Sequence, residues 1–210
     1  MIKNNWKILL ITSITILLPI LAGLILWDQL PEQIPLHWNM EGEIDDYSSK
    51  SFAVFGLPLI LLAFHLFTFF VTLSDPKNQN FSDKVLHLIF WIIPVMSVGL
   101  SAITYSVAMG KDVRVEAVIS VSLGLLFLVI GNYLPKCKQS YTIGIKLPWT
   151  LHSEENWNRT HRLAGWIWAI GGFMILVAGF FGVFMLTMTI PLIMALIPIV
   201  YSYLLHRKGI

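Results

Sequence analysis

The sequence has few charged residues and only one cysteine, and each of these features excludes some classes of protein. Only 12% of its 210 residues are Asp, Glu, Lys or Arg, whereas 56% are hydrophobic. This composition excludes an ordinary soluble domain and favours a chain that crosses a membrane several times. The single cysteine, Cys137, excludes an intramolecular disulfide and the usual multi-cysteine zinc site. A net charge of +2 gives no basis for direct nucleic-acid binding.

Ionisable side chains are nearly missing from the long apolar runs. His65 is the one deep candidate, while His87 and Glu116 fall near the ends of such runs. Ionisable residues inside a membrane mark proton and ion paths, and coupled transporters usually carry a buried carboxylate. We therefore expect His65 to be a neutral imidazole bonded to a neighbouring helix. The alternative is a proton relay, which would favour a small membrane transporter or permease.

Motifs for catalysis and metal binding are missing as well. The sequence contains neither an H-E-x-x-H nor a G-x-S-x-G pattern. His152 and His161 are nine residues apart, a spacing that does not place them on one helical face. We therefore expect no enzyme activity, no catalytic residue, no metal site and no cofactor.

Six long apolar runs are present instead, each long enough to cross a bilayer. They predict an all-α membrane protein, a single transmembrane domain over residues 1–210 built as a bundle of six helices. The expected spans are about 8–27, 52–73, 84–108, 115–134, 162–184 and 186–205. The first run follows Lys3 and Lys7, as a signal peptide would. It has no cysteine where a lipoprotein cleavage box needs one, so we expect an uncleaved helix.

The positions of the basic residues predict the orientation of the chain. Cytoplasmic segments of membrane proteins carry an excess of Lys and Arg. With both termini in the cytoplasm, eleven of the 14 Lys and Arg residues lie inside. Lys50, Lys111 and Arg114 then lie outside. This orientation makes residues 28–51 an extracellular loop module and residues 135–161 a cytoplasmic loop module, in a multi-pass protein of the cell membrane.

Residues 131–166 form the longest polar stretch, and its last part predicts the start of a helix. Ser153 is a candidate N-cap, and Glu154 and Glu155 follow it in the first turn, where the helix dipole favours carboxylates. Glu155 and Arg159 are four residues apart, as an ion pair on one helix face requires. We therefore expect a helix that begins in water and continues into the membrane.

Three further patterns concern local structure. Trp157 and His161 are also four residues apart and should share a helical face. Apolar positions 141, 143 and 145 alternate with polar ones, which predicts a short strand. Glycines recur every seven residues in the fifth run, at Gly165, Gly172 and Gly179. Small residues on one face let a neighbouring helix approach closely, so they predict helix packing within the bundle or, alternatively, a homodimer face.

The first polar loop, residues 28–51, is strongly acidic. It carries six Asp and Glu residues against Lys50 alone. Ile34, Leu36 and Trp38 alternate with other residues, and Gly42 follows in an expected turn. One interpretation is a hairpin that caps the outer face of the bundle. The other is an acidic and aromatic surface that meets a cationic peptide arriving from outside, because complementary charge speeds an encounter.

Two sets of residues together resemble a known family. The first set is similar to the signature of the SdpI family and comprises Gly131-Asn132-Tyr133-Leu134-Pro135, Tyr141-Thr142-Ile143-Gly144-Ile145, Pro148-Trp149-Thr150-Leu151 and Trp157-Asn158-Arg159-Thr160-His161-Arg162. The second set resembles an uncharacterised module that often precedes that signature, and comprises Leu30-Pro31-Glu32-Gln33-Ile34-Pro35-Leu36-His37-Trp38, Gly42-Glu43-Ile44-Asp45 and Ser49-Lys50. The two sets stand in the expected order and cover nearly the whole chain.

The resemblance implies a bacterial immunity protein that protects its cell from a secreted antimicrobial peptide toxin. It also implies a second role in signal transduction, in which the protein holds a cytoplasmic transcriptional repressor at the membrane. The partners expected on this basis are the peptide toxin, the repressor and the lipid bilayer.

The resemblance and the charge pattern together give two groups of candidate site residues. The candidates for a toxin-facing loop are Pro35, His37, Trp38, Gly42, Asp45 and Lys50. The candidates for a cytoplasmic platform are Asn132, Tyr141, Gly144, Pro148, Trp149, Thr150, Trp157, Thr160, His161 and Arg162. Two prolines, two expected turns and a capped helix indicate that the platform is a folded structure, which suits contact with another protein.

Overall fold

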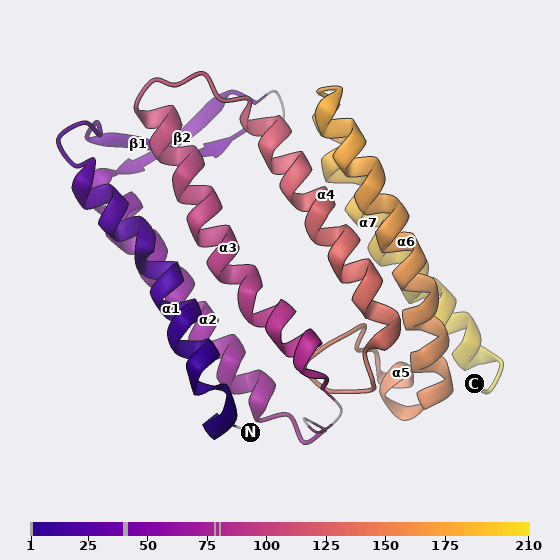
Figure 1. Cartoon of the computed structure of the whole chain (residues 1–210). Coiled ribbons are helices and arrows are strands. Elements are labelled where there is room, and N and C mark those ends of the chain that lie inside the picture. The colour runs from indigo at the N-terminus through magenta and orange to yellow at the C-terminus, as the bar shows by residue number, and fades with distance from the viewer. Residues whose placement is uncertain (1, 40–41, 78, 80) are drawn as a thin grey trace. The chain divides into compact units, whose positions relative to one another are not determined.

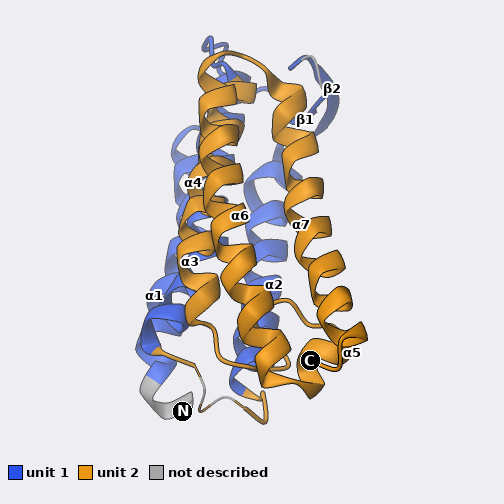
Figure 2. Ribbon diagram, turned by 90° about the vertical axis from the view of Figure 1, so that its right-hand side faces the viewer, with its two compact units in different colours: residues 1–73, 83–114 blue, residues 74–82, 115–210 orange. Residues whose placement is uncertain are grey.

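The part of the chain that the structure describes is mostly helical (Figure 1), and six of its helices are long and apolar enough to cross a membrane. The computed structural model describes residues 2–39, 42–77, 79 and 81–210. The six candidate spans are Asn5–Ile25, Phe52–Leu73, Asp83–Ala108, Val115–Lys136, Glu154–Phe180 and Phe184–Arg207. They agree with the expectation of six apolar helices. The chain divides into two compact units (Figure 2), residues 1–73 with 83–114 and residues 74–82 with 115–210.

Unit 1 contains α1 (Ile2–Ile25), α2 (Leu57–Leu73) and α3 (Asp83–Ala108). One turn of π-helix, η1 (Phe52–Gly56), precedes α2. Pro19 interrupts the hydrogen bonds of α1, since proline lacks an N–H and crowds the preceding turn. Hydroxyl groups of α3 bond to carbonyl groups around this point. Ser97 donates to Ile16 O at 2.9 Å and Tyr105 donates to Pro19 O at 3.2 Å.

His65 of α2 lies 2.8 Å from the Thr12 hydroxyl of α1 through its Nε2 atom. Thr12 donates its only proton to the main-chain oxygen of Ile8 at 2.6 Å. The imidazole is therefore the donor to Thr12, and its Nε2 carries a proton. This arrangement agrees with the interpretation of His65 as a residue bonded to a neighbouring helix.

The first loop adds a small sheet to unit 1, so the protein is not entirely α-helical. Strands β1 (Gln33–Trp38) and β2 (Ile44–Ser49) pair antiparallel, with Ile34 opposite Ser48 and Trp38 opposite Ile44. Gly42 lies between them at φ 81°, in the left-handed region that glycine enters without strain. Ile34 is fully buried against residues that precede and follow the hairpin, including Leu30 and Val54. This apolar anchor fixes the hairpin to unit 1, and the predicted hairpin is therefore present.

Unit 2 contains α4 (Val115–Tyr133), the short 3-10 turn η3 (Leu134–Lys136), α5 (Pro148–His152), α6 (Glu154–Phe180) and α7 (Phe184–Arg207). The glycine stripe of α6 packs on α4. A Cβ atom added at Gly172 would lie 2.7 Å from the main-chain oxygen of Gly124, and one at Gly165 would lie 2.9 Å from the main-chain oxygen of Gly131. Gly179 faces Ser120 in the same way. Packing within the chain thus accounts for the glycines that recur every seven residues in α6.

Candidate functional site

The residues between α4 and α6, together with the first turns of α6, form a folded polar segment (residues 135–161). Its helix starts as expected. The Ser153 hydroxyl oxygen accepts the N–H of Asn156 at 3.2 Å, and Arg159 pairs with Glu155 at 2.5 Å. Helix α6 then runs without interruption from Glu154 to Phe180. The predicted continuous helix is therefore present.

Trp157 and His161 form the centre of the polar segment. Both side chains are fully buried, and their rings stack with centroids 4.0 Å apart. The indole N–H of Trp157 donates to the main-chain oxygen of Cys137 at 2.8 Å. His161 accepts the N–H of Ile145 at its Nε2 atom, at 2.9 Å, and its Nδ1 atom lies 2.8 Å from the main-chain oxygen of Trp157. A carbonyl oxygen only accepts, so His161 is neutral with its proton on Nδ1.

Gly144 lies directly against this ring pair. A Cβ atom at position 144 would lie 2.5 Å from His161 Nε2 and 2.8 Å from the Trp157 ring, and the φ angle of Gly144 is +112°. Glycine is therefore required at this position for both space and backbone conformation. The pair of rings and Gly144 explain why these residue types occur together in the sequence.

The predicted strand around residues 141–145 is not present, and this prediction was wrong. The main-chain N–H groups of this part bond to side chains instead of to a neighbouring strand. Ile143 N–H donates to the Ser140 hydroxyl oxygen at 3.1 Å, and Ile145 N–H donates to His161. Residues 141–145 form an irregular loop instead, because side-chain acceptors have taken the donors that a strand would use.

Helix α5 is joined to the loop by buried hydrogen bonds. Pro148 occupies its first turn, where the missing N–H costs nothing. The buried Thr150 hydroxyl oxygen accepts the N–H of Leu147 at 2.9 Å and lies 2.9 Å from the main-chain oxygen of Ile145. Gln139 donates its amide N–H groups to the main-chain oxygens of Thr150 and Leu151 at 2.9 and 3.0 Å. These bonds make the segment one folded piece.

Asp75 is the residue that sequence analysis missed. It belongs to the α2–α3 linker, residues 74–82, which is part of unit 2 although the two helices that it joins are in unit 1. Its side chain is buried, and its Oδ2 atom accepts the N–H of Tyr141 at 2.9 Å and the N–H and hydroxyl of Thr142, both at 2.8 Å. Its Oδ1 atom accepts the N–H of Lys77 at 2.7 Å. The Asp-Pro pair at 75–76 was the only local signal, and it indicates no more than a turn.

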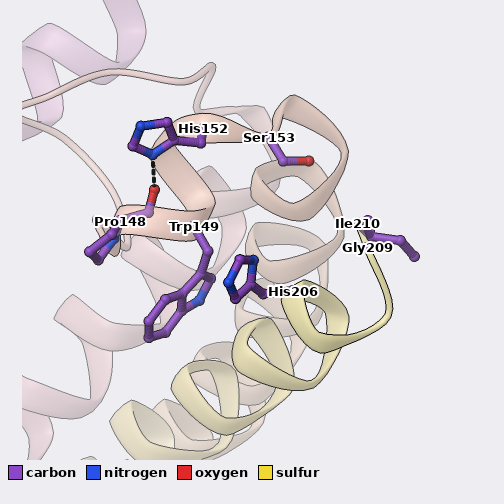
Figure 3. Close-up of a pocket in the computed structure, with 7 residues that line it drawn as sticks. All are labelled: Pro148, Trp149, His152, Ser153, His206, Gly209 and Ile210. Atoms are coloured by element: carbon purple, nitrogen blue, oxygen red, sulfur yellow. Dashed lines mark hydrogen bonds between the residues drawn. The ribbon is translucent and has the colours of Figure 1, made fainter.

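A shallow groove lies between α5 and the C-terminal end of α7 (Figure 3). Its lining is Pro148, Trp149, His152, Ser153, His206, Gly209 and Ile210. The Trp149 ring stacks on His206 with centroids 5.7 Å apart, and its indole N–H donates to the Ser202 hydroxyl at 3.0 Å. His152 also lines the groove, and it donates from Nδ1 to the main-chain oxygen of Pro148 (Figure 3) at 2.5 Å. Trp149 therefore connects α5 to α7.

The structure divides the platform candidates into buried and exposed residues. Thr150, Trp157, Thr160 and His161 have no exposed surface, and they hold the segment together from inside. Asn132, Tyr141, Pro148 and Arg162 are exposed, and Gly144 and Trp149 are half-buried. Tyr141 lies under the Lys77 ammonium group, which is 5.4 Å from its ring centroid. The surface that a partner can touch is thus formed by the second group and by the exposed lysines of the segment, Lys136, Lys138 and Lys146.

Cys137 is half-buried at the start of the polar segment, with Sγ 3.4 Å from the main-chain oxygen of Tyr133. Burial raises the pKa of this thiol to about 11. The thiolate is the reactive form, so the group is poorly nucleophilic at neutral pH.

The hairpin residues are divided in the same way. Pro35 and Lys50 are buried, whereas His37 and Asp45 are exposed and pair at 2.6 Å between Nδ1 and Oδ1. Lys50 bonds to Glu32 at 2.9 Å and to the main-chain oxygen of Trp27 at 3.2 Å, and it lies over the Trp27 ring. Lys50 thus anchors the hairpin to the end of α1. Trp38 and Gly42 are partly exposed near the hairpin turn.

Six candidate spans, a polar hairpin and a folded polar segment define the class of a multi-pass membrane protein. Residues 136–202 match the SdpI/YfhL protein family, and residues 14–62 match a domain of unknown function, DUF1648. The chain is thus similar to the SdpI/YfhL protein family over these residues of its C-terminal half. It is 26% identical over 205 residues to the immunity protein SdpI of Bacillus subtilis (strain 168), across 95% of this chain and 96% of that protein. No solved structure matches it.

Proposed function

We propose that the protein is an immunity protein that protects a bacterial cell from a secreted antimicrobial peptide toxin. The observation that carries this proposal is the similarity to the immunity protein SdpI over nearly the full length of both chains. The matched region includes both the hairpin and the polar segment, so the comparison does not rest on apolar helices alone.

We propose that the hairpin is the part of this protein that binds the toxin. Its exposed side chains include Asp45, Asp46 and Tyr47, and the side chain of Glu32 beside it is 87% exposed. A cationic peptide would be attracted to this acidic surface, and an exposed tyrosine offers it apolar contact. In the orientation that the basic residues predict, this surface faces the outside of the cell.

The polar segment is the part that we assign to a cytoplasmic partner, a transcriptional repressor held at the membrane. Its folded core supports an exposed surface that carries Lys136, Lys138, Tyr141 and Lys146. The sequence has no Asp or Glu between Glu116 and Glu154, so this surface would attract an acidic face of the repressor. Both chain termini lie in the cytoplasm in this arrangement.

Complementation tests the immunity function. The protein is expressed in B. subtilis cells that lack their own SdpI and are exposed to the toxin of that strain, and its amount in the membrane is measured by immunoblot. We expect survival well above that of cells with the empty vector. Cell death at the rate of the empty-vector strain, with the protein present in the membrane at the level of SdpI, would contradict the proposal.

A further inference from the structure

We propose that Asp75 is the positioning residue of the polar segment, and that the α2–α3 linker thereby determines the conformation of the segment. The starting observation is that the turn 140–142 has no acceptor of its own for two consecutive N–H groups. Both groups, and the Thr142 hydroxyl, donate to one oxygen of Asp75. The fold of the segment therefore depends on a side chain that lies 66 residues earlier in the chain than Tyr141.

A second contact from the linker reinforces the first. Lys77 donates from Nζ to the Gln139 side-chain oxygen and lies over the Tyr141 ring. Gln139 in turn donates to the main-chain oxygens of Thr150 and Leu151 in α5. Hydrogen bonds therefore run from the linker through the loop to α5, and no buried side-chain N or O atom of the described residues lacks a partner.

The chemistry at position 75 calls for a carboxylate in particular. One oxygen accepts three donors and the other accepts the Lys77 N–H, so both oxygens must act as acceptors. An asparagine has the same shape, but its NH₂ group must face donors on one side or the other. Among the described residues, no ion pair involves Asp75. Hydrogen bonds, rather than a basic side chain, therefore satisfy both oxygens of Asp75.

The inference gives the linker a role beyond connecting two helices. It joins α2 to α3, and these two helices belong to the unit that carries the hairpin. If the hairpin receives the toxin, the linker offers a direct covalent route by which that unit acts on the polar segment. This last step rests on the proposed function, whereas the positioning role of Asp75 does not.

The test uses the natural thiol as a reporter of order in the segment. The full-length protein, in lysed membranes where both faces are accessible, is treated with N-ethylmaleimide at pH 7.4, and modification of Cys137 is followed by mass spectrometry. Asp75→Asn and Thr142→Val weaken the contact, and Thr142→Ser retains the hydroxyl donor. Asp83→Asn is the matched control, because Asp83 is an exposed carboxylate at the start of α3.

We expect Asp75→Asn to raise the labelling rate at least about tenfold and Thr142→Val to raise it less, with Thr142→Ser and Asp83→Asn at the wild-type rate. The gain in thiolate alone contributes about 100-fold when the pKa of Cys137 returns from about 11 to its ordinary range, and greater access to the thiol adds to it. A wild-type rate in Asp75→Asn, or an equal rise in Asp83→Asn, would overturn the proposal. The assay uses neither toxin nor repressor, so it is independent of whether the protein confers immunity.

Discussion

Trp168 in α6 donates its indole N–H to the main-chain oxygen of Met194 in α7 at 3.0 Å. Met194 lies four residues before Pro198, so its oxygen would accept the N–H of residue 198 in a regular helix. Proline has no N–H, and the indole of the neighbouring helix supplies the missing donor. In a membrane, where water does not reach such a carbonyl group, this replacement lets α7 keep a proline inside a span.

The contact between Trp168 and Met194 makes a quantitative prediction. Trp168→Phe should lower the free energy of unfolding by about 1 kcal/mol, because the Met194 oxygen loses its donor. In a Pro198→Ala background the main chain regains its own N–H, and the same change should cost clearly less. Unfolding in mixed micelles of rising SDS content measures both costs. Equal costs in the two backgrounds would show that the indole stabilises the protein by packing alone.

The glycine contacts between α4 and α6 predict a strict size limit at Gly172. Gly172→Ala places a methyl group 2.7 Å from main-chain atoms of α4, which cannot move aside as a flexible side chain can. We expect a loss of about 1–3 kcal/mol in the same SDS assay. Gly99→Ala is the control, since nothing lies within 4 Å of the added atom. A Gly172→Ala protein as stable as Gly99→Ala would refute the close approach of the two helices.

The orientation can be tested by thiol labelling, but not with the natural cysteine. The raised pKa of Cys137, about 11, makes its labelling slow on either side of the membrane. Lys138→Cys in a Cys137→Ala background presents an exposed thiol instead. We expect a membrane-impermeant maleimide to label it only after the cells are permeabilised. Labelling in intact cells would place the polar segment outside and reverse the predicted topology.

His65 distinguishes the immunity protein from the transporter alternative. Its Nε2 atom, which donates to Thr12, can be replaced by the side-chain NH₂ of glutamine, whereas asparagine is too short to reach. His65→Gln should therefore keep protection within about twofold, since one hydrogen bond is preserved. Survival under toxin, at equal amounts of membrane protein, is the measurement. Loss of all protection in His65→Gln would indicate that the imidazole titrates, and would favour a proton-coupled transporter.

Substitutions in the hairpin and on the exposed surface of the polar segment should impair different activities, the first toxin resistance and the second recruitment of the repressor. Asp45→Asn combined with Asp46→Asn should reduce the tolerated toxin dose by about tenfold, since electrostatic steering is lost. Asp112→Asn, an exposed carboxylate in the loop between α3 and α4, is the matched control. Lys138→Ala combined with Lys146→Ala should leave survival unchanged and reduce recruitment of a fluorescently tagged repressor to the membrane.

Substitutions of the buried residues of the polar segment cannot distinguish these two activities. Trp157 and His161 have no exposed surface, so their replacement disturbs the fold of the segment rather than a contact surface. If both exposed-residue pairs reduced both activities equally, a single conformation of the whole protein would be the better explanation.

Local patterns were sufficient to predict much of this protein. Six apolar runs of membrane length predict six helices, because the bilayer leaves backbone groups no other partners. The Ser153 cap and the Glu155–Arg159 pair depend on neighbours three and four residues away, and the structure contains both. The glycines that recur every seven residues in α6 likewise indicated a close contact with another helix, although they did not indicate which helix packs there.

Only the tertiary structure determined which polar residues are buried. Asp75 and Thr142 are 67 residues apart, and neither periodicity nor composition relates them. The predicted strand at 141–145 failed for the same reason, since its N–H groups found acceptors on Asp75 and His161, which are distant in the sequence. From the sequence, Lys50 would be expected to be a solvated charge. It is buried instead, because Glu32, the Trp27 carbonyl group and the Trp27 ring surround it. A sequence shows which side chains can form hydrogen bonds, but burial makes those bonds obligatory, and the fold alone determines what is buried.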